Sequence, residues 1–91
     1  MSIRVRVPTP LRNVTGGLAD LEATAPTVLA CFGELETQFP GFSDRVLEEN
    51  GEVRRFVNVF VNGEDIRFLD GLNTALKSGD ELSIVPAMAG G

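Results

Sequence analysis

The chain has 91 residues, 43% hydrophobic and 23% charged, which is typical of one small globular domain and not of a disordered chain. Its net charge of -5 argues against nucleic acid as a partner, because nucleic-acid recognition needs a clustered basic surface. The sequence holds no histidine and a single cysteine, Cys31, so it offers no imidazole for catalysis or metal binding and no second thiol for a disulfide.

The chain also lacks the patterns of a membrane or secreted protein. No apolar stretch approaches the ~18 residues that a membrane-spanning helix needs. The first residues begin a strand pattern and not a signal peptide. We therefore expect a cytoplasmic protein with no membrane partner.

The first predicted elements are two strands. Residues 3–7 alternate apolar and cationic side chains, as a half-buried strand does. Pro8 and Pro10 end this strand because proline has no N–H for a sheet ladder. After a turn at Thr15-Gly16-Gly17, residues 18–23 are predicted to form the second strand of a hairpin.

A helix is predicted to follow, with Thr27 as its N-cap and Pro40-Gly41 as its end. Residues 43–49 are predicted to add a short second helix. Apolar residues at helical spacing define one stripe, which we expect to pack on the sheet against Ile3, Val5, Leu82 and Ile84. The stripe consists of Val28, Leu29, Phe32, Leu35 and Phe39.

The rest of the chain is predicted to form mainly strands. Residues 56–61 form the strongest strand pattern in the sequence. Asn62-Gly63 is the favoured pair of a type I′ hairpin turn and leads into a predicted short strand at 66–68. Residues 70–76 are predicted as a loop with a short helical turn, and residues 82–85 as the last strand.

This order of elements predicts the fold. One helix stripe over a sheet of this order is typical of a two-layer α+β domain. The order matches the β-grasp, or ubiquitin-like, arrangement, with a mixed sheet of four to five strands packed on one main helix. In that arrangement the last strand lies mid-sheet and parallel to the first. We expect a domain over residues 1–86 and a flexible C-terminal tail over residues 87–91.

The tail ends in Gly90 and Gly91, which is the most informative motif of the sequence. Glycine leaves no side chain around the terminal carboxylate, so such a tail fits a narrow active site. We interpret the Gly-Gly end as a reactive terminus, whose carboxylate is the group that partner enzymes modify.

Several short motifs together resemble a known family. They are Pro8-Thr9-Pro10-Leu11-Arg12, Thr15-Gly16-Gly17, residues 55–62, residues 64–68, Gly71-Leu72, Gly79-Asp80 and residues 86–91. In these motifs the sequence resembles the ThiS/MoaD family of ubiquitin-like sulfur carriers over nearly its whole length. It is most similar to the branch that serves cysteine biosynthesis.

The resemblance implies a chemistry for the tail. An E1-like adenylyltransferase/sulfurtransferase would use ATP and magnesium to adenylate the carboxylate of Gly91. Sulfur would then displace AMP and leave a thiocarboxylate for a sulfur-accepting, cysteine-synthase-like enzyme. Gly90, Ala89, Met88 and Ala87 would be recognised as the tail. The chain itself would bind no metal or cofactor and would be a co-substrate, because the catalytic groups belong to its partners.

Other functions share this tail chemistry and stay open. The chain could be the small subunit of molybdopterin synthase, or a sulfur carrier for thiamine or for tRNA thiolation. It could also be a ubiquitin-like modifier that is conjugated to lysines of other proteins. A plain β-grasp interaction domain is the alternative from another class.

A docking surface is expected on the sheet face that the helix leaves uncovered. Phe56 and Phe60 lie on one face of the strand at 56–61, opposite its three valines. Exposed on that face, they would form an apolar patch for partners, with Arg4 or Arg6 at the rim.

The remaining candidate groups are predicted to be structural. Cys31 lies beside the helix stripe and is expected to be a largely buried thiol without a reactive role. Glu34 and Glu36 are expected to lie on the solvated face of the helix and not to act as catalytic carboxylates.

Overall fold

The computed structural model describes residues 2–86. The helices are α1 (Val28–Gln38) and α2 (Phe42–Val46), and short 3-10 helices span Thr9–Leu11, Ile66–Phe68 and Gly71–Asn73. The strands are β1 (Ile3–Arg6), β2 (Asp20–Ala23), β3 (Val57–Val61), β4 (Glu64–Asp65) and β5 (Glu81–Pro86).

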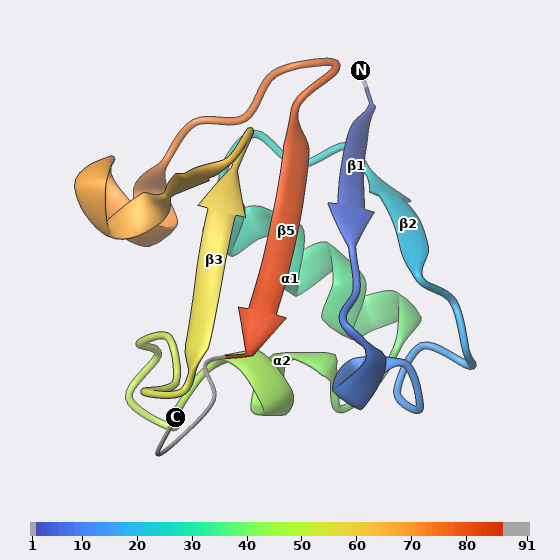
Figure 1. Ribbon diagram of the computed structural model, residues 1–91. Helices are drawn as coiled ribbons and strands as arrows, with labels where there is room; N and C mark the ends of the chain where they lie inside the picture. The colour runs from blue at the N-terminus through green and yellow to red at the C-terminus, as the bar shows by residue number, and fades with distance from the viewer. Residues whose placement is uncertain (1, 87–91) are drawn as a thin grey trace.

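The strands form one five-stranded sheet in the order β2-β1-β5-β3-β4. The pair β1–β5 is parallel, and the pairs β1–β2, β3–β5 and β3–β4 are antiparallel. Figure 1 shows β5 between β1 and β3, with α1 crossing behind the sheet. This is the predicted β-grasp fold, in which the last strand lies in the middle of the sheet and runs parallel to the first.

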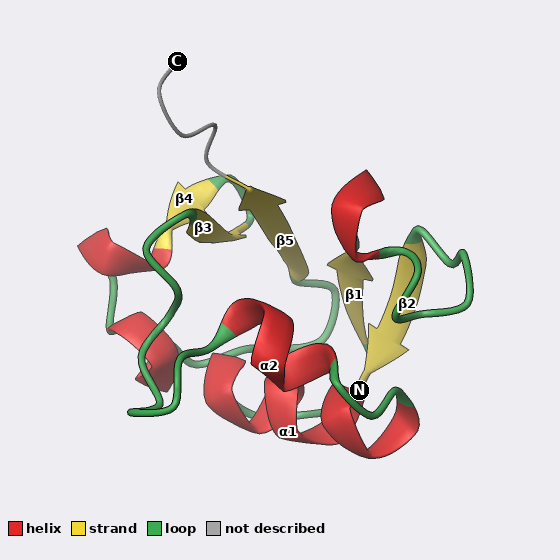
Figure 2. Cartoon of the chain, turned by 90° about the horizontal axis from the view of Figure 1, so that it is seen from below, coloured by secondary structure: helices red, strands yellow, loops and turns green. Residues whose placement is uncertain are grey.

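The α1 helix begins as predicted, because the Thr27 side chain accepts a hydrogen bond from the Ala30 N–H at 3.2 Å. Both helices lie on the same side of the sheet (Figure 2). The buried residues of α1 are Val28, Cys31, Phe32 and Leu35. The prediction that Leu29 belongs to the stripe is wrong, since Leu29 is 45% exposed. Cys31 takes its place because it lies three residues from Val28 and four from Leu35, on the same face of the helix.

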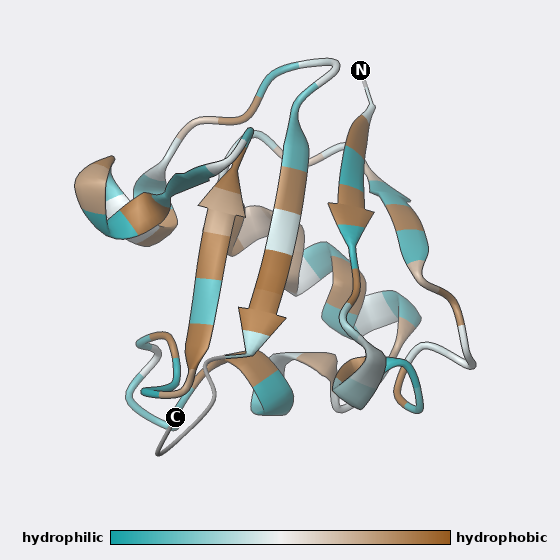
Figure 3. Ribbon diagram, in the orientation of Figure 1, coloured by the Kyte–Doolittle hydropathy of each residue, from teal (hydrophilic) through white to brown (hydrophobic). Residues whose placement is uncertain are grey.

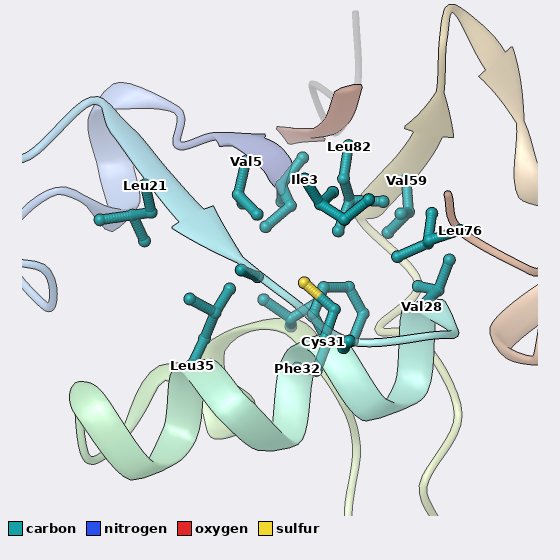
Figure 4. Close-up of a cluster of buried hydrophobic side chains, with 14 of the residues drawn as sticks. Ile3, Val5, Leu21, Val28, Cys31, Phe32, Leu35, Val59, Leu76 and Leu82 are labelled. Carbon is teal, nitrogen blue, oxygen red and sulfur yellow. The ribbon is translucent and has the colours of Figure 1, made fainter. Parts of the chain in front are cut away.

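The core lies between α1, α2 and the sheet. Side chains of α1 point toward those of β1, β3 and β5 (Figure 4). The Phe32 ring meets the Phe42 ring of α2 with centroids 6.2 Å apart, which ties the second helix into the same core. The predicted sheet contacts Ile3, Val5, Leu82 and Ile84 are all buried in this cluster.

The β3–β4 hairpin confirms the predicted turn. Asn62 and Gly63 have φ values of 52° and 87°, as a type I′ turn requires. The prediction of a strand at 66–68 is wrong, because this segment is a 3-10 helix. Asp65 caps it by accepting a hydrogen bond from the Arg67 N–H at 2.8 Å, so the chain turns away from β3 after only two paired residues.

Two glutamates of α1 have structural contacts that the sequence did not indicate. Glu36 accepts hydrogen bonds from the backbone N–H groups of Gly41 and Ser43 at 3.0 and 2.8 Å, and these lower its pKa. Glu34 accepts from the Thr24 N–H at 3.0 Å. Both are half-buried, so these carboxylates fasten neighbouring loops to α1 and do not only face solvent.

Candidate functional site

The position of β5 determines where the C-terminal segment leaves the domain. Its last residue, Pro86, pairs with Val57 at the start of β3. On its other side, Ser83 pairs with Arg6 at the end of β1. The chain therefore leaves the middle of the sheet. The predicted tail residues, Ala87, Met88, Ala89, Gly90 and Gly91, lie outside the described residues.

The sheet face that the helices leave uncovered, here called the outer face, carries three of the four predicted docking residues. Alternation along each strand places Arg4, Arg6 and Phe60 on this face, away from the core. Figure 3 shows the alternation as hydrophobic and hydrophilic bands along β1. Ser83 pairs with both Arg6 and Phe60, so these three residues form one row across β1, β5 and β3. The structure therefore brings Phe60 and Arg6 to one surface.

Acidic residues surround the two arginines. Arg6 forms ion pairs with Asp20 at 3.4 Å and with Glu81 at 3.5 Å. Arg4 pairs in register with Glu22 on one side and Glu81 on the other. Exposed ion pairs of this kind contribute only about 0–1 kcal/mol each to stability. Two ion pairs therefore orient Arg6 over the sheet, whereas Arg4 has acidic residues as its register neighbours on both sides.

Phe56 lies next to the end of β5. It is 52% exposed and directly precedes Val57, the partner of Pro86. Together with Arg55 it lines a hollow of about 370 Å³. A second hollow, of about 420 Å³, lies on the other side of β5 and includes Arg6 and Pro86. Hollows thus lie on both sides of the point where the chain leaves the sheet.

Sequence reasoning missed one residue of this surface. Val85 is 43% exposed and pairs with Asn58 on the outer face, close to the end of β5. Its odd position, directly after the alternating buried positions Leu82 and Ile84, was the signal that could have revealed it. Phe60 and Val85 thus form the apolar part of the outer face. Phe56, which was predicted to share the strand face of Phe60, lies instead in the turn before β3.

The other candidate groups are not part of a reactive site. Cys31 is fully buried, as predicted, and burial raises the pKa of its thiol to about 12. The thiolate is the nucleophilic form, so this cysteine is inert in the folded protein. Residues 2–86 contain no group of three histidine, cysteine, aspartate or glutamate residues that could hold a metal ion. None of their helices is long and apolar enough to cross a membrane.

A five-stranded mixed sheet on one main helix, with the last strand central, defines the class of ubiquitin-like β-grasp proteins. Within this class, the family model described as "ThiS family" matches residues 5–91. The chain belongs to the ThiS family.

Known relatives agree with this assignment. The sulfur carrier protein CysO of Mycobacterium tuberculosis is 43% identical over 93 aligned residues, which cover all of both chains. Small archaeal modifier protein 3 of Haloferax volcanii is 38% identical over 96 aligned residues, again with full coverage of both. A chain in the crystal structure of the Amycolatopsis orientalis BexX/CysO complex is 44% identical and superposes with a TM-score of 0.91, covering 98% of this chain and 99% of that one.

The family assignment establishes the general role. The chain is a sulfur carrier and not an enzyme, because ThiS-family proteins are non-catalytic carriers. Carriers of this family bind no cofactor. The surface described above is therefore a candidate for docking on partner proteins and not a catalytic centre.

Proposed function

We propose that this protein carries sulfur for cysteine biosynthesis as a thiocarboxylate on Gly91. The full-length similarity to CysO, at 43% identity, is the observation that carries this proposal. The central position of β5 supports it, because the segment that follows Pro86 starts from the middle of a broad surface on which a partner can dock.

The chemistry needs an activating partner. A carboxylate is a poor acyl donor, since its leaving group would be oxide. An E1-like enzyme would transfer AMP from ATP to the Gly91 carboxylate, with release of pyrophosphate and with magnesium supplied at its own site. Sulfide then attacks the acyl carbon, AMP leaves with the electron pair of the broken C–O bond, and the thiocarboxylate remains. Where the donor is a persulfide, the attack gives an acyl disulfide, and a thiol of the activating system must cleave its S–S bond to release the thiocarboxylate, itself ending in a disulfide.

Partners would dock on the outer sheet face. Phe60 and Val85 offer the apolar contact, with Phe56 beside the end of β5, and Arg4 and Arg6 would lie at its rim. The CysO crystallised with BexX is a relative that was solved in a complex with another protein, which supports an interface of this kind. A cysteine-synthase-like enzyme would take the sulfur from the thiocarboxylate.

The intact mass of the protein, measured after incubation with its activating enzyme, ATP, magnesium and sulfide, tests the proposal. We expect the mass to rise by the difference between sulfur and oxygen. Deletion of Gly91 moves the carboxylate back by about 3.5 Å. The reacting atoms must approach within about 3–3.5 Å, so this variant should gain no sulfur. Cys31→Ala is the control and should still be charged. Sulfur gained without Gly91, or lost with Cys31→Ala, would refute the proposal.

A second function has specific support. The 38% identity to small archaeal modifier protein 3 favours a ubiquitin-like modifier, in which the activated Gly91 is joined to lysines of other proteins. Both functions share the adenylation step and differ in the acceptor. Protein purified from its native host distinguishes them, because conjugation gives adducts of high mass and sulfur transfer gives only the thiocarboxylate.

A further inference from the structure

One side of β3 is open along part of its length. The strand pairs with β5 over residues 57–61, but with β4 only at Phe60 and Val61. Within residues 2–86, no strand pairs with Val57 to Val59 on the side away from β5. The open stretch arises where the chain turns into the 3-10 helix Ile66–Phe68 instead of continuing β4.

The hydrogen-bond pattern shows which backbone groups face this opening. In an antiparallel pair, alternate residues direct their N–H and C=O groups to the partner strand. The Asn62 N–H donates a hydrogen bond to the Glu81 carbonyl at 2.8 Å. Every second residue before Asn62 faces the same neighbour, so the backbone groups of Phe60 and Asn58 also point to β5. Val59 and Val57 therefore direct their backbone groups to the open side. The Val57 N–H donates a hydrogen bond to the Arg54 carbonyl at 3.0 Å. The Val57 carbonyl and the N–H and C=O groups of Val59 therefore remain available to an added strand.

A groove runs along this open edge. It has a volume of about 410 Å³, and its lining combines apolar side chains from the end of the core with three arginines at the rim. The apolar residues include Val53, Val57, Val59, Ile66 and Leu72, and the arginines are Arg54, Arg55 and Arg67. Ligand sites in proteins have volumes of about 300–1,000 Å³ and a similar mixture of apolar walls and a few polar groups.

The charge of the rim is unusual for this chain. The whole protein carries -5, whereas the groove lining holds three arginines against two acidic residues, Glu52 and Asp65. Asp65 is already bound by Arg67 at 2.8 Å. Arg54 donates to the Asp44 carbonyl at 2.7 Å. Arg55 is exposed, and among the described residues it has no hydrogen-bond or ion-pair partner, so its guanidinium is available to an incoming carboxylate.

We propose that the open edge of β3 binds an extended acidic segment of a partner protein, which adds to the sheet as a short antiparallel strand. The segment occupies the place that a longer β4 would take, and its backbone bonds to Val59 and Val57. Its apolar side chains enter the groove, and its carboxylates reach Arg55 and the neighbouring arginines. A second copy of this chain is disfavoured in a symmetric pairing, because that would bring the same three arginines together.

This inference does not depend on the sulfur chemistry. The groove lies along the side of β3 that faces away from β5. Its lining includes neither Arg6, Phe60 nor Val85, so a partner bound here leaves these residues of the outer sheet face uncovered.

The test is a titration of the ¹⁵N-labelled protein with a blocked pentapeptide of alternating valine and glutamate, followed by amide chemical shifts. We expect the largest shifts at Val57, Asn58 and Val59, with a dissociation constant in the high micromolar range. Arg55→Gln should weaken binding about three- to tenfold, which corresponds to the loss of one partly exposed ion pair and its hydrogen bonds. Arg45→Gln is the matched control, because Arg45 is an exposed arginine of α2 outside the groove, and it should bind as the parent does.

Two further peptides make the test specific. A peptide N-methylated on the valines cannot donate backbone hydrogen bonds and should not bind, and a lysine peptide should bind more weakly by at least tenfold. Equal binding of either peptide would overturn the proposal. So would shifts centred on the outer sheet face, an unchanged affinity of Arg55→Gln, or shifts that follow protein concentration without peptide, which would show self-association.

Discussion

At the scale of single residues, Phe32 and Asp80 stabilise the fold in different ways. Phe32 is 0% exposed and fills the space between α1, the sheet and Phe42. Asp80 is buried next to the β3–β4 hairpin, where its carboxylate accepts hydrogen bonds from the Asn62 side chain at 3.0 Å and from the Lys77 N–H at 2.9 Å. The first contribution is packing, whereas the second is polar and depends on charge.

Replacing Phe32 with alanine should therefore lower the free energy of unfolding by about 3–5 kcal/mol, because it removes a fully buried ring and leaves a cavity. Urea unfolding of the parent and of the variant measures this difference. Leu29→Ala in the same helix is the control and should change stability by less than about 0.5 kcal/mol, since Leu29 is 45% exposed. Similar losses for both variants would mean that the packing face of α1 is assigned wrongly.

Asp80 should make stability depend on pH. The hydrogen bond from Asn62 and that from the Lys77 N–H lower the pKa of its carboxyl below the ordinary value of 3.8. The pKa of Asp80 is lower in the folded than in the unfolded protein. The charged carboxylate therefore stabilises the fold at pH values above the ordinary pKa, and this contribution is lost as the pH falls through the lowered pKa. The Asp80→Asn variant should be less stable than the parent at neutral pH. Its stability should then fall less than that of the parent as the pH is lowered.

Unfolding midpoints of Asp80→Asn between about pH 6 and about pH 2 check this expectation. Asp70→Asn is the control, because Asp70 is exposed and its side chain caps no helix. A midpoint of Asp80→Asn that falls with pH as steeply as that of Asp70→Asn would contradict the assigned role of Asp80.

At the scale of elements, glycine has opposite effects in α1 and in the β3–β4 turn. Gly33 lies inside α1, and a Cβ added there meets no atom within 4 Å. Gly63 lies in the hairpin turn with a φ of 87°, a conformation that residues with a side chain rarely adopt. Gly33 therefore only weakens its helix, whereas Gly63 is required by its turn.

The two Gly→Ala substitutions should then change stability in opposite directions. Gly33→Ala should stabilise the protein by about 0.5–1 kcal/mol, because alanine is the better helix former. Gly63→Ala should destabilise it by about 1 kcal/mol or more, because the turn forces a strained backbone. Thermal unfolding of both variants provides the measurement. A stabilising Gly63→Ala would show that the turn is not of type I′.

At the scale of the whole molecule, the two layers leave one broad surface free. Both helices cover the same side of the sheet, so the outer face of β1, β5 and β3 stays open (Figure 2). Phe60 and Val85 give this face its apolar character, and the exposed Phe56 lies in the turn next to the end of β5. A carrier without catalytic groups needs such a surface, because its partners must hold it while they act on its end.

Phe60→Ala should weaken binding to the activating enzyme by about 2 kcal/mol, or roughly thirtyfold, because buried aromatic anchors dominate interfaces. Its stability should fall little, because the ring lies on the outer face. Titration calorimetry measures the affinity. Phe68→Ala is the matched aromatic control, since Phe68 is 83% exposed on the 3-10 helix away from that face. If Phe68→Ala weakens binding and Phe60→Ala does not, the interface lies elsewhere.

The sequence alone determined the order of elements, the Thr27 cap, the Asn62-Gly63 turn and the family, because these depend on local propensity, periodicity and short motifs. Only the tertiary structure decided that Cys31 and not Leu29 packs on the sheet, since a helix stripe has no fixed orientation until it meets its partner layer. It also decided that β4 stops after Asp65, because one side-chain cap outweighs a weak strand preference. The open edge of β3 follows from that early stop, and no pattern within a single segment could have predicted it.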